Sequence, residues 1–227
     1  MRKLTVLILI GLFVLPAFAD REKEVERVQL AAKVIEEIMS AEDSGIPNEV
    51  FTDAECVAVV PSLAKAAFVF GGKYGKGVAT CRTPSGGWSA PSFFKIAGGS
   101  FGLQIGGEAV DLVMLVMNKE GMNELLSSKF KLSGEGSVAA GPVGRQAAGQ
   151  TDWKMRAKVL TYSRSRGLFA GLSLEGATIT HDKGDTRDFY GRNIAYKRIL
   201  TGQVQTPAEA EPFVAAVAKH GGSRPPE

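Results

Sequence analysis

Hydrophobic and polar residues follow two different periods along this chain. Apolar residues from Val25 to Ile38 recur at helical spacing and charged residues fill the other positions, which predicts an amphipathic helix over Asp20–Ser40. Pro47 is suited to the first turn of a second, short helix. From Cys56 the pattern changes to short apolar runs separated by glycine, which is typical of strands and turns.

The glycine-rich middle of the chain predicts strands that follow one another directly. We expect strands over Cys56–Val60 and Val110–Met117, and a helical turn at Ser62–Ala67. Asn118 is expected to cap a helix over Lys119–Ser128. Because turns rather than crossover helices join most of the strands, the sheet is predicted to be mostly antiparallel, and its many glycines favour a curled, barrel-like shape.

The last third of the chain predicts a return to helix. A polar turn is expected at His181–Arg187, a short helix over Ala195–Leu200 and a final helix over Pro207–Lys219. Helices therefore gather at the two ends of the chain, so the fold class is α+β: a curled, barrel-like, mostly antiparallel sheet with N-terminal amphipathic helices and a C-terminal helix. We predict a single domain over 20–220 and a disordered tail over 221–227.

The first residues have the pattern of a secretory signal peptide. Met1-Arg2-Lys3 is basic, the run that follows to Leu15 is almost wholly apolar, and Ala17-Phe18-Ala19 fits a small-x-small cleavage site. Residues 1–19 are therefore predicted to be removed near Ala19, which makes the chain a periplasmic or secreted protein. An uncleaved membrane anchor is the alternative.

The net charge of the chain hides an uneven distribution. The formal net charge is +3, and so small a value predicts no nucleic-acid partner. No Asp or Glu occurs from Cys56 through Gly107, and Asp152 is the only acid from Gly136 through Leu174. Our candidates for an anion-binding face are the basic residues Lys73, Lys76, Arg82, Arg145, Arg164 and Arg166. The alternative is that these windows lack acids merely because strands disfavour them.

Arg164 and Arg166 stand in a conspicuous stretch. They precede an alternation of apolar residues from Leu168 to Leu174, which predicts a turn followed by a strand with one buried face. The turn would present both arginines to a ligand. Alternatively, the arginines are only the solvated end of a strand.

The two cysteines leave two interpretations open. In an oxidising compartment Cys56 and Cys81 form a disulfide if their Cα atoms lie within bonding reach, and two separate buried thiols are the alternative. The two histidines, His181 and His220, have no clustered spacing with the cysteines. We therefore predict no metal site.

The glycine-rich motifs do not predict catalysis. Gly98-Gly99-Ser100-Phe101-Gly102 matches the pattern of a serine-hydrolase elbow, but that elbow requires a helix after the serine, whereas the period from Phe101 predicts a strand. The run from Gly71 to Gly77 lacks the ending of a Walker A loop and the strand–helix context of a dinucleotide site. We predict a non-enzymatic protein without cofactor. A hydrolase that acts through Ser100 is an alternative.

A series of short motifs resembles the SYLF domain. The match runs in order from about Val25 to Val217, nearly the whole predicted mature chain. It includes Gly45-Ile46-Pro47, Cys81-Arg82, the segment 87–91, the segments 137–145 and 162–171, and Tyr190-Gly191.

The resemblance implies a lipid-binding module. Eukaryotic members of this family bind phosphoinositide membranes, with the N-terminal amphipathic helix involved, and some fungal members bind actin. Because this chain has a predicted signal peptide and lacks an SH3 or FYVE-type domain, we expect anionic phospholipid or a membrane surface as its partner, for example phosphatidylglycerol or cardiolipin of a bacterial envelope. Actin and phosphoinositides are not expected.

The main alternative is a non-enzymatic structural or protein-interaction module of the envelope. In that case the helix over Asp20–Ser40 docks a protein partner. This helix is rich in Glu, unlike typical membrane-surface helices. Packing on its own sheet is the third use that its apolar face allows.

Overall fold

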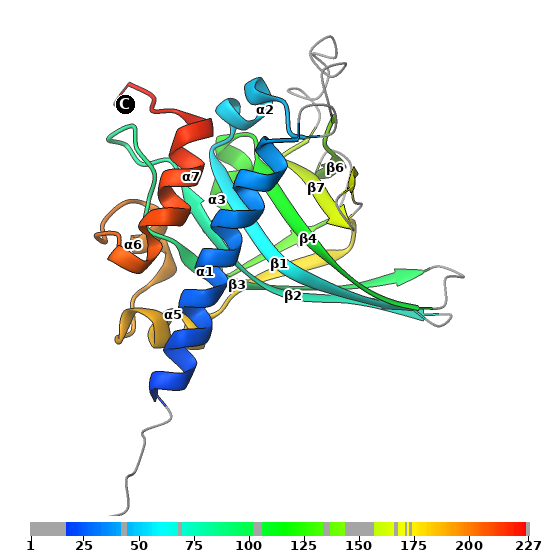
Figure 1. Ribbon diagram of the computed structural model, residues 1–227, viewed down its shortest axis with the longest axis horizontal. Coiled ribbons are helices and arrows are strands. Elements are labelled where there is room, and N and C mark those ends of the chain that lie inside the picture. The colour runs from blue at the N-terminus through cyan, green and yellow to red at the C-terminus, as the bar shows by residue number, and fades with distance from the viewer. Residues whose placement is uncertain are drawn as a thin grey trace, which may run out of the picture.

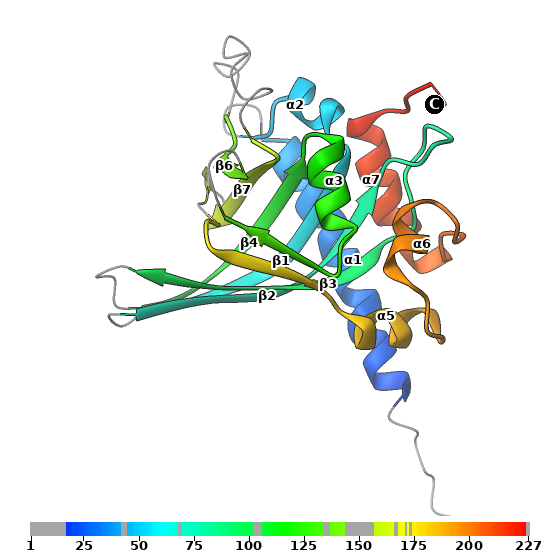
Figure 2. The same cartoon turned by 180° about the vertical axis from the view of Figure 1, so that it is seen from behind.

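The structure is a computed structural model of the chain. It describes residues 17–41, 45–67, 70–101, 106–133, 137–143, 157–165, 168–170, 172 and 174–225. A curved sheet forms the centre of the molecule, with α1 and α7 on one side and α3 on the other (Figures 1 and 2).

The helices and strands follow one another in an order that matches the α+β class. They are α1 (Ala17–Met39), α2 (Asn48–Asp53), β1 (Cys56–Ala67), β2 (Phe70–Cys81), β3 (Ser92–Phe101), β4 (Gly106–Val116), α3 (Lys119–Leu125), β5 (Lys129–Leu132), β6 (Val138–Ala140), β7 (Val159–Ser165), β8 (Leu168–Ala170), β9 (Ala177–His181), α5 (Lys183–Tyr190), α6 (Tyr196–Leu200), the 3-10 helix η2 (Ala208–Ala210) and α7 (Glu211–Gly221).

The sheet confirms the predicted curled and mostly antiparallel architecture. Its strand order is β5-β9-β3-β2-β1-β4-β7-β6, and β8 pairs with β7. Among the described strands, β6 and β7 are the one parallel pair, and the sheet is nearly closed into a barrel. Antiparallel pairing follows from the direct turns between successive strands, which leave no room for a crossover.

Alternate residues of the strands build two apolar cores, one on each side of the sheet. In β1, Val57 and Val59 face the core that contains α1 and α7, whereas Ala58 and Val60 face the interior of the curved sheet. Phe51, Phe93 and Phe213 fill the helix-side core.

The amphipathic helix is confirmed as α1, and the structure decides where its apolar face goes. Val28, Ala31, Ile35 and Ile38 are buried in the helix-side core. Of the three uses considered for this face, packing on its own sheet is the one that the structure has.

The N-terminus of α1 lies within the predicted signal peptide. Residues 1–16 are outside the described ranges, and Ala17 to Ala19 form the first turn of α1. Cleavage near Ala19 stays a prediction. Within the described ranges, no helix combines the length and apolarity that a membrane crossing requires.

The helical turn predicted at Ser62–Ala67 was wrong, because these residues belong to strand β1. Strand β1 continues through Pro61, with a register shift against both neighbouring strands. Ser62 adopts a positive φ of 59°, and its backbone N–H donates to Asp111 Oδ1 at 3.1 Å. Proline is tolerated in a central strand at such a bulge because no ladder hydrogen bond is needed from it there.

The prediction of a polar turn at His181–Arg187 was also wrong. His181 ends β9 and the helix α5 begins at Lys183. The side chain of Asp182 accepts hydrogen bonds from the backbone N–H groups of Gly184 and Asp185. Asp182 is thus an N-cap residue, a helix-start signal. The corresponding prediction at Asn118 is confirmed, because its Oδ1 accepts from Gly121 N at 2.8 Å.

The far ends of β1 to β4 project beyond the helices (Figure 1). We call this part the extension; its described residues are 62–67, 70–75, 97–101 and 106–109. Ser100 lies in it, and the strand predicted after Ser100 falls partly on residues 102–105, outside the described ranges.

Candidate functional site

Lys76 is held by acidic residues from a distant part of the chain. Its Nζ lies 2.8 Å from Asp185 Oδ1 and 3.5 Å from Asp182 Oδ2. These carboxylates shield its charge from an external ligand, although they also raise the pKa of Lys76 against the effect of its burial.

The same carboxylates connect α1 to α5. Arg27 donates to Glu24 and, at 2.8 Å, to Asp185 Oδ2, and Lys95 lies 2.9 Å from Asp182 Oδ2. Glu24 is only 4% exposed, and burial raises its pKa to about 7 against the opposing charge of Arg27. We call Glu24, Arg27, Lys76, Lys95, Asp182 and Asp185 the α1–α5 charge cluster; it contains equal numbers of acids and bases.

Arg82 serves the structure around it. It is 6% exposed, and its guanidinium donates to the carbonyl oxygens of Thr52, Ala54, Gly221 and Gly222. Its Cζ lies 4.4 Å from the ring of Trp88. The sequence analysis named Arg82 as a candidate for an anion-binding surface. Because these groups surround it, Arg82 is buried and does not lie on such a surface.

Arg164 joins β7, β4 and α1. Its Nη2 and Nε lie 2.6 and 3.1 Å from Asp111 Oδ2, and its Nη1 donates to Glu37. Burial lowers the pKa of Arg164, but these two carboxylates outweigh it and the net shift is upward. Arg164 therefore stays positively charged, and the carboxylates of Asp111 and Glu37 balance its charge within the molecule.

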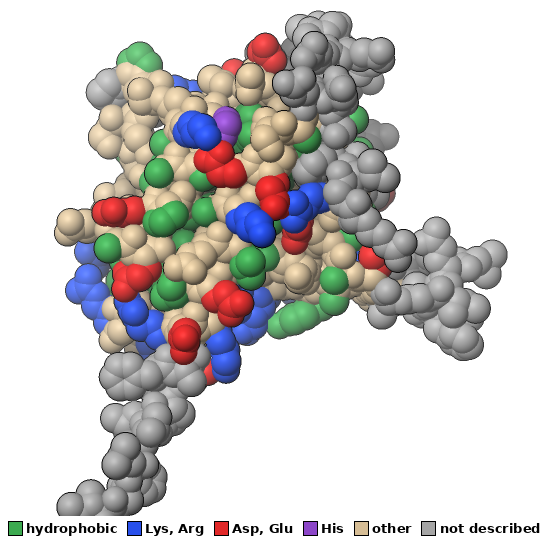
Figure 3. All heavy atoms as spheres, in the orientation of Figure 1, with side chains coloured by type: hydrophobic (Ala, Val, Ile, Leu, Met, Phe, Trp, Pro, Cys, Tyr) green, Lys and Arg blue, Asp and Glu red, His purple; other side chains and the backbone are tan. Residues whose placement is uncertain are grey.

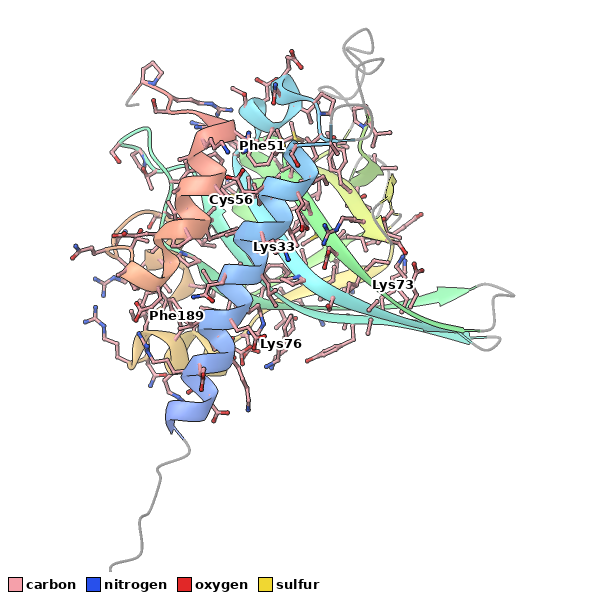
Figure 4. All side chains as sticks on the ribbon, viewed as in Figure 1. Lys33, Phe51, Cys56, Lys73, Lys76 and Phe189 are labelled. Atoms are coloured by element: carbon pink, nitrogen blue, oxygen red, sulfur yellow. A yellow bond between two sulfur atoms is a disulfide. The ribbon has the colours of Figure 1, made fainter. Side chains whose placement is uncertain are left out.

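The other basic candidates do not join these residues. Lys73 is the cross-strand partner of Lys65, and burial together with the charge of Lys65 lowers its pKa. Figure 4 shows Lys73 on the extension and Lys76 beside α1 and α5. Arg145 and Arg166 lie outside the described residues. The structure thus places the described candidates in separate surroundings.

The surface over α1 and α5 carries both charges. In Figure 3, blue and red side chains lie next to one another on this side of the molecule. This mixture differs from the basic face expected from the acid-free windows.

Cys56 and Cys81 are joined by a disulfide. They are cross-strand partners in the β1–β2 pair, and both side chains are buried. Of the two interpretations that the sequence left open, the structure has the bonded one.

Ser100 lies within β3, paired with Gly71. Strand β3 continues to Phe101, the last residue described before residues 102–105, so the residue directly after Ser100 belongs to a strand and not to the helix that a serine-hydrolase elbow requires. His181 Nε2 lies 2.8 Å from the carbonyl oxygen of Leu125, and its ring stacks on Tyr196. In the part of the chain that the structure describes, no group of three or more His, Cys, Asp or Glu side chains is arranged to hold a metal ion.

The extension has an exposed, uncharged face that the sequence did not predict. Tyr74 is 50% exposed, and its cross-strand partners are Ala64 and Ala97. Partners across a ladder point to the same side of a sheet, here the side on which α1 lies. We call the exposed residues of this surface the Tyr74 face: Ala64, Gly72, Tyr74, Ala97, Gly99 and Ala109.

The signal for this face was present but weak. Small residues alternate along four strands that lie side by side only after folding, and the large side chain of Tyr74 stands among them. Because β-branched or charged residues usually occupy exposed strand positions, their replacement by Ala and Gly leaves a smooth surface.

Comparison with known proteins found a matching family model and several similar proteins. Residues 97–220 match the family model described as Ysc84: Las17-binding protein actin regulator. The chain is 39% identical over 188 residues to SH3 domain-containing YSC84-like protein 1 of Rattus norvegicus, which covers 80% of this chain and 55% of that protein.

Two relatives from Saccharomyces cerevisiae are similar over about three quarters of this chain. The chain is 38% identical over 175 residues to Protein YSC84, covering 76% of this chain and 37% of the relative. It is 37% identical over 174 residues to LAS seventeen-binding protein 3, covering 75% and 38%. The chain spans between about a third and a half of the length of these relatives.

These names correct the partner expected from the sequence. Actin was not expected and anionic phospholipid was given first place, but the family description and the yeast names point to protein partners and actin regulation. They are the names of binding proteins and not of enzymes. Since the matching family model covers more than half of the residues, the chain belongs to the Ysc84 family of SYLF-domain proteins.

Proposed function

We propose that this chain is a non-enzymatic protein-binding module that contacts its partner through the Tyr74 face. The single observation that carries the proposal is the half-exposed ring of Tyr74 on an uncharged sheet surface. Tyrosine is enriched in the centres of protein interfaces because it offers a large contact area and a hydroxyl group at little cost in conformational entropy.

The neighbours of Tyr74 suit close contact with another protein. Ala64 and Ala97 flank it on the adjacent strands, and Gly72 and Gly99 lie next to them on the same face. Such small side chains let a partner approach the sheet closely without displacing long, mobile groups. Contact there would desolvate apolar surface and leave no buried charge unpaired.

The family description supports the class of partner that we propose. It names Las17 and actin regulation, so we propose a protein of the actin-regulatory machinery as the partner. Actin filaments and Las17 are the two proteins to test first.

Phospholipid binding by an exported chain is the finer function expected from the sequence. Lys76, Arg82 and Arg164 are engaged within the protein, which weakens their attraction for an external anion. Anionic vesicles therefore enter the test only as a comparison. Export remains our prediction, and the N-terminal residue of the protein recovered from its natural source checks it.

The test measures binding of the full chain to actin filaments by co-sedimentation and to immobilised Las17. We expect the wild type to bind at least one of them and Tyr74→Ala to weaken that binding about tenfold, which corresponds to roughly 1.4 kcal/mol. Val143→Ala, which changes an exposed apolar residue outside this face, should bind like the wild type.

Two outcomes would overturn the proposal. One is undiminished binding by Tyr74→Ala. The other is binding to neither protein, while vesicles that contain phosphatidylglycerol bind the chain and neutral phosphatidylcholine vesicles do not. The second outcome would favour the phospholipid function.

A further inference from the structure

The segment that follows α7 lies in a groove of the same molecule. Residues 222–225 run between the end of α2 with the start of β1 on one side and the β2–β3 loop on the other. Disorder was expected for this segment, yet in its described part Gly222 and Arg224 both hydrogen-bond to other parts of the protein.

The groove holds the backbone of the segment at several points. Arg82 donates from Nη2 to Gly221 O at 2.6 Å and from Nη1 to Gly222 O at 3.2 Å. Trp88 Nε1 donates to Gly222 O at 3.1 Å, and Arg224 N donates to Gly86 O at 3.0 Å. Contacts to main-chain atoms do not depend on the side chains of the bound segment, so another extended segment can make them too.

The side chain of Arg224 enters a set of oxygen acceptors. Its Nη1 lies 2.6 Å from Glu55 Oε1, and its Nη2 donates to Asp53 O at 2.7 Å and Thr52 O at 3.1 Å. The Glu55 side chain is 14% exposed. A guanidinium presents several donors in a plane and matches such a set, whereas an ammonium group offers only a point charge.

The groove is built by groups that other parts of the protein hold in place. Arg82 is fixed by the carbonyl oxygens of Ala54 and Thr52 at 2.9 and 2.8 Å and by Trp88. Gly86 has a φ of +86°, and a Cβ there would overlap the carbonyl oxygen of Arg224. The groove therefore requires glycine at this position, both for the turn and for the approach of the bound backbone.

A cavity of about 220 Å³ adjoins the bound arginine. Glu55, Thr83, Lys119, Met122 and Thr201 contribute to its walls, together with Pro225. A ligand longer than residues 222–225 finds additional room there.

We propose that this groove is a recognition site for an extended peptide segment that carries an arginine, and that residues 222–225 occupy it as an internal ligand. An external segment of the same chemistry binds when the internal one leaves. Because the internal ligand is tethered, it competes at a high effective concentration and keeps the site closed to weak ligands. This site is separate from the Tyr74 face, and its test needs neither actin nor Las17.

The experiment uses the full chain and a fluorescent peptide, Gly-Gly-Ser-Arg-Pro-Pro-Glu, followed by fluorescence anisotropy. The variant Arg224→Ala weakens the internal ligand, so we expect it to bind the peptide at least tenfold more tightly than the wild type. Arg192→Ala, at an exposed arginine elsewhere, should leave the wild-type affinity unchanged. A peptide with Ala in place of its arginine should bind Arg224→Ala at least tenfold more weakly.

Changes in the groove provide the second half of the test. In the Arg224→Ala background, Gly86→Ala should abolish peptide binding and Glu55→Gln should weaken it severalfold, with circular dichroism as the check on folding. If Arg224→Ala does not fold, the wild type is titrated with excess peptide and the NMR signal of the Trp88 indole N–H should shift. Equal affinity of wild type and Arg224→Ala, indifference to the peptide arginine, or no binding would overturn the proposal.

Discussion

The ring of Tyr162 lies so close to Gly141 that a Cβ at position 141 would overlap its Cζ and Oη atoms. Gly141 N donates to the carbonyl oxygen of Thr161 at 3.0 Å, which holds the two segments together. Tyr162 is fully buried. This contact joins two of the motifs on which the family resemblance rests and gives a packing reason for the glycine.

Gly141→Ala should therefore destabilise the protein. The added methyl group has to displace a buried ring, and such overpacking costs typically about 1–3 kcal/mol. Chemical denaturation measures the loss. Gly72→Ala is the matched control, because a Cβ there meets nothing within 4 Å, and it should be neutral or slightly stabilising. Equal stability of Gly141→Ala and the wild type would contradict the packing argument.

Glu24 should make stability depend on pH. Burial raises its pKa from 4.5 to about 7 in the folded protein, so the folded state holds this proton more tightly than the unfolded state. The contribution of protonated Glu24 is present in full below about pH 4.5 and is lost as the pH rises through about 7. We expect Glu24→Gln to remove a decline on the order of 2 kcal/mol over this range.

The measurement compares denaturation of wild type and Glu24→Gln at several pH values from 4.5 to 8. His181 changes stability in the opposite direction, because burial lowers its pKa and its contribution is lost as the pH falls. His181 is present in both proteins, so the difference between their free energies of unfolding at each pH reports the titration of Glu24. Parallel curves would show that Glu24 does not titrate in this range.

Arg164→Ala should lower the stability of the folded protein. It leaves the carboxylates of Asp111 and Glu37 without their shared cation, and we expect a loss of about 1–3 kcal/mol. Arg187→Ala is the control, since Arg187 pairs with its neighbour Asp188 at the surface and such pairs contribute little. Thermal unfolding of both variants checks this; a similar effect of the two would refute a structural role for Arg164.

The disulfide between Cys56 and Cys81 should resist reduction in the folded protein. Both side chains are buried, so a reductant reaches them only after unfolding. We expect no alkylation of either cysteine after native treatment with a reductant, as measured by mass spectrometry. Once the bond is reduced in denaturant, the protein should be less stable by about 2–4 kcal/mol. Rapid alkylation under native conditions would contradict the burial of the pair.

Local signals in the sequence were sufficient for several elements. The spacing of apolar residues predicted α1, and Asn118 predicted the start of α3, because both effects act within a few residues. Local reasoning was wrong at Pro61, where a bulge lets β1 continue, and at Asp182, whose capping role was overlooked. The strand register that makes the bulge tolerable is a contact between distant segments.

The sequence by itself determined the fold class, the main helices and the family resemblance, since these depend on periodicity and on motifs read in order. Only the tertiary structure decided what the charged residues do. Windows without acidic residues predicted a basic face, but Asp185 reaches Lys76 and Asp111 reaches Arg164 from other parts of the chain. Charges interact through space, so their partners appear only when the strands and helices are placed side by side.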